Sequence, residues 1–217
     1  MSISSSEKVL VSIEDSIAIV TIINPAANTW DLESLPALEA VVHKLNGMAN
    51  VRALVITGQG EKFFSAGADL NQFASGDPIA AGAMGDAFGA AFETLADYRG
   101  VSIAAINGYA MGGGLEVALA CDIRIAESHA ALALPEARVG LLPCAGGTQR
   151  LAQLVGEGWA KRIILCGERV SAEKAIMLGL VEEVVEPGTS LATAIDLAKR
   201  ALDQSPTSIA ALSLIHI

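Results

Sequence analysis

Hydrophobic and polar positions in the first sixty residues follow two periods, one typical of strands and one typical of helices. Two β-branched apolar runs, residues 9–13 and 17–23, flank a short polar turn and predict a β-hairpin. A helix is expected from about Ser34, with Pro36 in its first turn. This helix is expected to bury Leu38, Val41, Val42 and Leu45. The apolar run over 52–57 then predicts a buried strand.

The middle of the chain continues this alternation of strands and helices. After a loop over 58–69, the small and polar segment 71–82 is expected to be a mobile connection. A helix then runs to Tyr98, and its apolar stripe is expected to face the core rather than form a binding surface. This stripe consists of Met84, Phe88, Phe92 and Leu95. Residues 101–106 and 122–126 predict two further strands.

Beyond Pro135 the pattern becomes mainly helical. Strands that alternate with helices and lead into a helical region indicate an α/β fold, though not a simple doubly wound sheet. No linker divides the 217 residues, so one domain with a large core is the simplest expectation. The predicted helices lie near 146–155, 157–166, 171–179 and 189–203, and the glycines expected to end or break them are Gly156, Gly167 and Gly179.

Composition narrows the class of protein. Hydrophobic residues make up 52% of the chain and aromatic residues only 4%, which suits the aliphatic core of an α/β or helical protein. The net charge of −10 argues against a broad nucleic-acid-binding surface, because such a surface needs clustered Lys and Arg. Cys121, Cys144 and Cys166 form no CxxC pair and are expected to be free thiols. No basic segment leads into an apolar run near residue 1, so a cytoplasmic location is expected.

The glycine-rich segment 106–116 carries the strongest signal for chemistry. Three consecutive glycines, 112–114, stand between an apolar strand and a run of good helix formers. Glycine lets backbone N–H groups approach a ligand, and a helix N-terminus favours an anion or a polarised carbonyl oxygen. Glu116 is close enough to act on such a ligand, although taken alone it could be the buried partner of a cation. This carboxylate also argues against a membrane span over 101–121.

Two other segments add small residues and a second carboxylate. The loop 63–70 could present free backbone N–H groups, and an ordinary turn with Asp69 as N-cap is an equal alternative. Glu136 lies in an otherwise apolar stretch. Its alternatives are a carboxylate at a helix N-terminus or an ion pair with Arg138 or Arg150.

Together these segments resemble the enoyl-CoA hydratase/isomerase family, also called the crotonase superfamily. The resemblance extends over about residues 9–203. It implies an α/β spiral of repeated ββα units over 1–190, followed over 191–217 by the start of a C-terminal helical region. That region is expected to be truncated at the apolar residues 213–217, which bears on the homotrimer or dimer of trimers that the family forms. The matching motifs are FSAGADL at 64–70, INGYAMGGGLEVALACDIRIA at 106–126 and LPEARVGLLPCAGGTQRL at 134–151.

The resemblance also implies a reaction and the residues that carry it. The backbone N–H groups of Ala66 and Gly113 match the two oxyanion-hole donors for the thioester oxygen of an acyl-CoA. Glu116 and Glu136 match the two glutamates of the hydratases, which add water in syn fashion to 2-trans-enoyl-CoA. In this assignment Glu116 accepts the proton of the water that attacks C3, and protonated Glu136 supplies a proton to C2. The acyl-CoA pocket is expected to include Ala66, Gly67, Ala68, Asp69 and Gly113.

Other functions stay open at this point. A Δ3,Δ2-enoyl-CoA isomerase needs one principal carboxylate, the one matching Glu136, and a non-catalytic acyl-CoA-binding fragment is expected to keep the oxyanion loops and lose at least one glutamate. A nucleotide-binding α/β protein lacks support, because neither GxxxxGK[ST] nor GxGxxG occurs. No metal and no separate cofactor are expected, since coenzyme A is part of the substrate. Lys62 is the best local cation for its phosphates, but a solvated lysine is an equal alternative.

Overall fold

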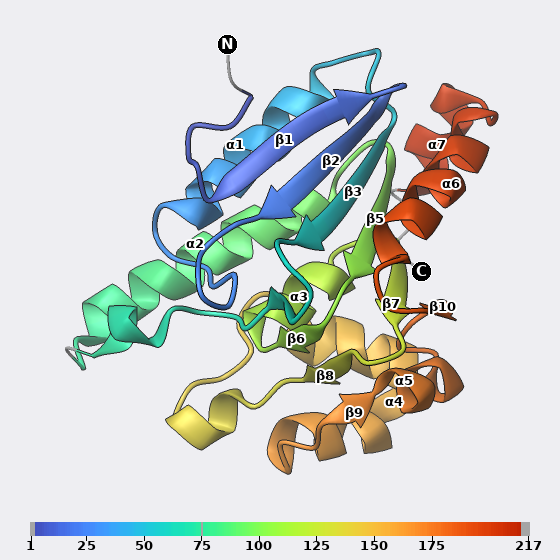
Figure 1. Ribbon diagram of the computed structural model, residues 1–217. Coiled ribbons are helices and arrows are strands. Elements are labelled where there is room, and N and C mark those ends of the chain that lie inside the picture. Colours follow the sequence, from blue (N-terminus) through green and yellow to red (C-terminus); the bar gives the residue numbers. More distant parts are fainter. Residues whose placement is uncertain (1–2, 75, 214–217) are drawn as a thin grey trace.

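The computed structural model describes residues 3–74 and 76–213 and confirms the α/β class (Figure 1). Apart from residue 213, the predicted early end of the chain lies outside the described residues. The strands are β1 (Val9–Glu14), β2 (Ile17–Ile22), β3 (Ala53–Gly58), β4 (Phe63–Ser65), β5 (Val101–Ile106), β6 (Tyr109–Met111), β7 (Ile123–Glu127), β8 (Ala131–Ala133), β9 (Val170–Ser171) and β10 (Glu183–Val185). The helices are α1 (Ser34–Asn46), α2 (Pro78–Ala96), α3 (Gly113–Leu119), α4 (Gly147–Leu165), α5 (Ala172–Leu178), α6 (Ser190–Leu202) and α7 (Pro206–Ser213), with short 3₁₀ helices η1 (Leu70–Phe73) and η2 (Glu136–Val139).

Two sheets organise the chain. The larger has the order β1-β2-β3-β5-β7-β10 and is parallel except for the β1–β2 hairpin. The smaller has the order β4-β6-β8-β9 and is parallel except for β8–β9. Three successive units, β3-β4-α2, β5-β6-α3 and β7-β8-α4, each place one strand in the large sheet, the next in the small sheet, and then form a helix. The predicted spiral of ββα units is therefore confirmed.

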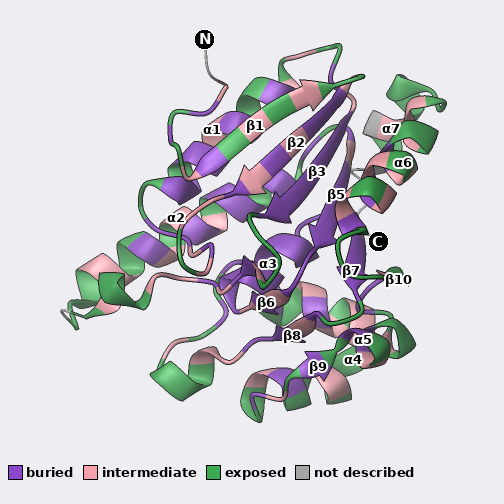
Figure 2. Cartoon of the chain, in the orientation of Figure 1, coloured by how far each residue is buried: buried purple, intermediate pink, exposed green. Residues whose placement is uncertain are grey.

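The central strands β3, β5 and β7 of the large sheet are buried on both faces, as their runs of apolar side chains require. On β3, Leu54 and Ile56 belong to the core that includes α1 and α2, whereas Ala53 and Val55 pack with Ala194 and other residues of α6. Because successive residues of a strand point to opposite faces, these helices cover opposite sides of the sheet (Figures 1 and 2). The expected core residues of α1 and the apolar stripe of α2 are buried. The predicted division near residue 190 stays a prediction.

Turn chemistry explains where several elements begin and end. Asp15 and Ser16 adopt positive φ angles of 46° and 71°, the conformation of a tight two-residue hairpin turn. Gly156 (φ 75°, ψ 160°) interrupts the helical conformation of α4, so the two predicted helices form one element with a kink. Gly179 ends α5 in the left-handed conformation, as predicted. All three cysteines are free thiols.

The segment 71–82 differs from the expected mobile connection. Its first residues belong to η1, and α2 begins at Pro78 rather than beyond residue 82. Asp77 caps α2 by accepting a hydrogen bond from the backbone N–H of Ile79 at 2.9 Å. An N-cap aspartate followed by proline is a helix-start signal that outweighs the small, polar composition of the segment. Within the described ranges, no helix combines the length and apolar character needed to cross a bilayer.

Candidate active site

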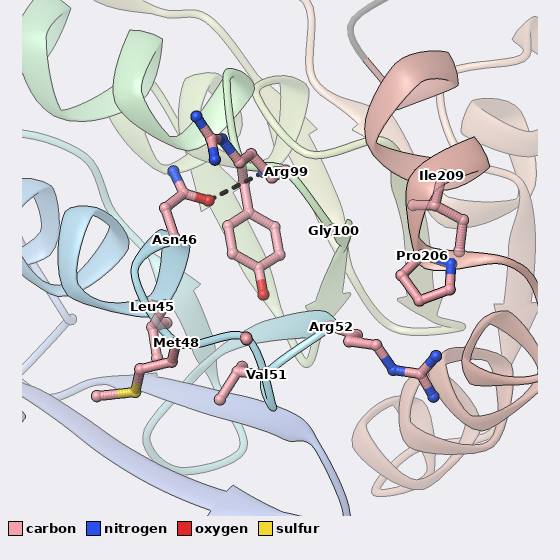
Figure 3. A pocket seen from close by; sticks show the side chains of 11 residues that line it. Leu45, Asn46, Met48, Val51, Arg52, Arg99, Gly100, Pro206 and Ile209 are labelled. Atoms are coloured by element: carbon pink, nitrogen blue, oxygen red, sulfur yellow. Dashed lines mark hydrogen bonds between the residues drawn. The ribbon is translucent and has the colours of Figure 1, made fainter.

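A cavity of about 730 Å³ lies where the small sheet meets the N-terminus of α3, the wall of α2 and the loop after η2. It contains both predicted glutamates, together with Ala66, Ala68 and Gly113. A smaller pocket of about 160 Å³ lies between Tyr98, Arg52 and α7 (Figure 3) and has no acidic side chain in its lining. The candidate chemistry therefore belongs to the larger cavity. Its remaining lining residues are Thr29, Leu70, Phe73, Ala81, Met84, Gly85, Phe88, Met111, Gly112, Pro135, Arg138, Val139, Gly140, Leu141, Leu142, Cys144 and Arg169.

Glu116 is held rigidly in the wall of the cavity. Its side chain lies on α3, and the residue is only 2% exposed. Its Oε1 accepts hydrogen bonds from the backbone N–H groups of Ala145 at 2.8 Å and Gly147 at 2.9 Å. The pKa of Glu116 is raised overall, because the effect of burial exceeds the lowering by these two hydrogen bonds and by the charge of Arg150. Glu116 is thus a buried carboxyl group whose charged form is supported by fixed donors.

Glu136 has a contrasting environment. Both of its carboxyl oxygens are buried, and neither has a hydrogen-bond partner among the residues the structure describes. The expected alternative of an ion pair is not found, since Arg138 donates to the carbonyl of Gly167 and Arg150 to that of Ala145, each at 3.1 Å. Burial raises the pKa of Glu136 to about 7; its own backbone N–H opposes this rise, and the charge of Glu116 adds a smaller increase. Glu136 can therefore hold a proton near neutral pH.

The loop 66–69 supplies a different oxyanion donor from the one predicted. The N–H of Ala66 donates to the carbonyl of Ala27 at 2.9 Å, so the prediction that this group is free for a ligand is wrong. The N–H of Trp30 instead donates to the carbonyl of Gly67, and the N–H of Asp69 donates to the carbonyl of Trp30, each at 2.8 Å. Because these two bonds flank Ala68, the N–H of Ala68 faces away from Trp30. In the described chain the backbone N–H groups of Ala68 and Gly113 donate no hydrogen bond to a protein acceptor, and both residues line the cavity.

Gly67 and Asp69 support the loop without lining the cavity. Gly67 has a φ of +88°, and a side chain there would come within 2.6 Å of the carbonyl oxygen of Met111 and 3.0 Å of the Gly113 nitrogen. It therefore lets the loop pack against the start of α3. Asp69 caps η1 by accepting the N–H of Asn71 at 3.0 Å, which is the alternative that the loop pattern left open.

Two cationic side chains line the cavity, and the sequence did not single them out as ligands. Arg138 lies on η2, and Arg169 lies over the ring of Tyr109 at 5.6 Å from its centroid. Neither forms an ion pair with a carboxylate in the described part of the chain. Lys62, the predicted local cation, lies beside Tyr109 in a separate pocket outside the cavity. Met84 and Phe88 were predicted as core only, yet they both pack in the core and line the cavity.

Comparisons with known proteins agree with this arrangement. The family model described as Enoyl-CoA hydratase/isomerase matches residues 12–215. The short-chain-enoyl-CoA hydratase of Clostridium acetobutylicum is 38% identical over 202 residues, which cover 93% of this chain and 77% of that protein. A structure of Pseudomonas aeruginosa DspI is 60% identical with a TM-score of 0.94, covering 95% of this chain and 85% of that one. The enoyl-CoA hydratase structure from Bacillus anthracis is 35% identical with a TM-score of 0.92, covering 95% and 81%. This chain belongs to the enoyl-CoA hydratase/isomerase family.

Proposed function

We propose that this enzyme adds water across the C2=C3 bond of a 2-trans-enoyl-CoA to give a 3-hydroxyacyl-CoA. The observation that carries the proposal is the pair of glutamates in one cavity with opposed environments. Glu116 is held by two backbone donors, whereas Glu136 is unpartnered among the described residues and has a pKa raised to about 7. Two carboxyl groups with different hydrogen-bonding environments suit a reaction that needs one base and one acid.

The thioester oxygen binds the N–H groups of Ala68 and Gly113 in this mechanism. Negative charge moves onto that oxygen as water attacks C3, and preorganised donors stabilise it by on the order of 3 kcal/mol each. Glu116 takes one proton from the attacking water, and the remaining hydroxyl bonds to C3. Glu136 gives its proton to C2 as the double bond is lost. The proton left on Glu116 returns to Glu136 before the next turnover, so both carboxyl groups regain their starting states.

Arg138 and Arg169 are assigned to the anionic carrier of the substrate. Coenzyme A carries phosphate groups, and arginine forms strong charge-assisted hydrogen bonds to phosphate. The two side chains line the cavity without a carboxylate partner in the described chain, so their charges are available to a ligand. This assignment replaces the one that the sequence suggested for Lys62. Assembly into trimers stays part of the proposal and awaits a measurement of molecular mass in solution.

The test is the loss of the 2-enoyl thioester absorbance with crotonyl-CoA. Wild type is compared with Glu116→Gln and Glu136→Gln, which keep the shape of each side chain and remove its acid–base function. Rapid loss that both substitutions abolish supports hydration with two carboxyl groups. Activity that survives Glu116→Gln, together with conversion of a 3-enoyl-CoA, would instead identify an isomerase. Absence of turnover with retained acyl-CoA binding would refute a catalytic role.

A further inference from the structure

The wall that α2 contributes to the cavity is apolar and regular. Ala81, Met84, Gly85 and Phe88 line the cavity, and their spacing places them on one face of the helix. Leu70 and Phe73 of η1 and the loop residues Leu141, Leu142 and Cys144 also line it. This side of the cavity, called here the apolar arm, contains none of the groups assigned to the reaction or to the carrier.

Gly85 lines the cavity, whereas Gly82 and Gly89 of the same helix do not. Glycine inside a helix is unfavourable relative to alanine, and its usual justifications are a positive φ or a close packing contact. Neither applies, because Gly85 has helical geometry and an added Cβ would meet only Cys144 Sγ, at 3.8 Å. By contrast, a Cβ at Gly113 would lie 2.5 Å from the Phe88 ring, and one at Gly114 only 2.1 Å from the Ser65 carbonyl oxygen. The missing side chain at 85 therefore leaves room inside the apolar arm.

The apolar surface continues outward to the rim. Leu70 is 54% exposed, Val139 52% and Leu142 69%, although all three line the cavity. A crotonyl group has a single methyl carbon beyond its double bond and would leave these side chains in water. A longer alkyl chain would cover them, and each methylene group withdrawn from water strengthens binding about fourfold.

We infer that the apolar arm selects thioesters of acyl chains of medium length or longer, and that Gly85 determines this selectivity. The inference rests on the proposed function, since it treats the cavity as an acyl-thioester site. It places the alkyl chain between α2 and the loop after η2, alongside Gly85 and Cys144. A large side chain at position 85 fills that space and removes the advantage of a long chain over a short one.

The experiment measures binding of saturated acyl-CoA ligands, which cannot be hydrated. Titration calorimetry with butyryl-CoA, octanoyl-CoA and dodecanoyl-CoA compares wild type, Gly85→Leu and Gly82→Leu. Gly82 is the matched control, because it lies on the same helix, is exposed and does not line the cavity, and a Cβ added there would meet no atom within 4 Å. Both substitutions replace glycine with a better helix former, and circular dichroism verifies that both variants are folded.

Wild type and Gly82→Leu are expected to bind octanoyl-CoA at least about tenfold more tightly than butyryl-CoA. In Gly85→Leu this ratio is expected to fall close to one. Equal affinities for all three ligands in wild type, or an unchanged ratio in Gly85→Leu, would overturn the inference. Turnover of crotonyl-CoA reports separately on the proposed function, so loss of hydration with an intact chain-length ratio would refute the reaction and leave the selectivity supported.

Discussion

Replacing Glu136 by glutamine is expected to stabilise the protein above neutral pH while it abolishes turnover. The pKa of Glu136 is raised from 4.5 to about 7, so ionising this buried carboxyl group opposes folding by about 3 kcal/mol at most. The proton-linked stability is fully present below pH 4.5 and is lost as pH rises through about 7. Glutamine is neutral at every pH and avoids that loss.

Guanidinium chloride denaturation at pH 5 and pH 8 measures the effect, with Glu14→Gln as a control at an exposed carboxylate. At pH 8 the Glu136→Gln variant should unfold at a higher midpoint than wild type, and at pH 5 the two midpoints should nearly coincide. Glu14→Gln should show no such pH-dependent difference. Equal stabilisation at both pH values, or a less stable variant at pH 8, would refute the burial argument. In wild type, hydration should decline as pH rises above about 7, because Glu136 must be protonated to act as the acid.

Three other substitutions test separate parts of the site. Gly147→Ala places a Cβ 2.8 Å from Glu116 Oε1 and should lower kcat by about ten- to a hundredfold through a lost hydrogen bond to a charged group; an unchanged kcat would contradict that role. Gly113→Ala keeps its N–H but crowds Phe88, so it should cost about 1–3 kcal/mol in denaturation experiments, and adding Phe88→Leu should recover part of the loss. Arg138→Gln should raise KM about tenfold for crotonyl-CoA but not for crotonyl-pantetheine, which lacks phosphate; a rise for both would refute the phosphate assignment.

The long elements of the fold could be predicted because their apolar residues recur over several turns or strand positions. The hairpin 9–22, α1 and α6 are of this kind. The small sheet was missed, since β4, β6 and β8 have three residues each and lie within loops rich in glycine and alanine. Strands of this length show no measurable alternation of their own. Their position depends on pairing between successive units, which a local pattern does not contain.

The site was predictable where the chemistry belongs to side chains and less so where it belongs to the backbone. Glu116 and Glu136 could be named from their motifs, and both line the cavity. Which N–H group of the loop 66–69 is free depends on the distant partners Ala27 and Trp30, so the choice of Ala66 failed. The contribution of Arg138 also depends on tertiary structure, because an arginine beside a short 3₁₀ helix gives no sequence signal of facing a cavity.

The order of strands in the large sheet has a consequence for synthesis of the protein. From β1 to β10 this order follows the order of the chain, so each new strand joins the edge formed by the strand made before it. While the ribosome is still making later segments, β3, β5 or β7 in turn forms an open edge, where unpaired backbone N–H and C=O groups lie beside apolar side chains and can recruit other chains. Because β10 pairs last, the nascent chain exposes an aggregation-prone edge until about residue 185 has left the ribosome. A chaperone that covers strand edges should therefore increase the yield of folded protein.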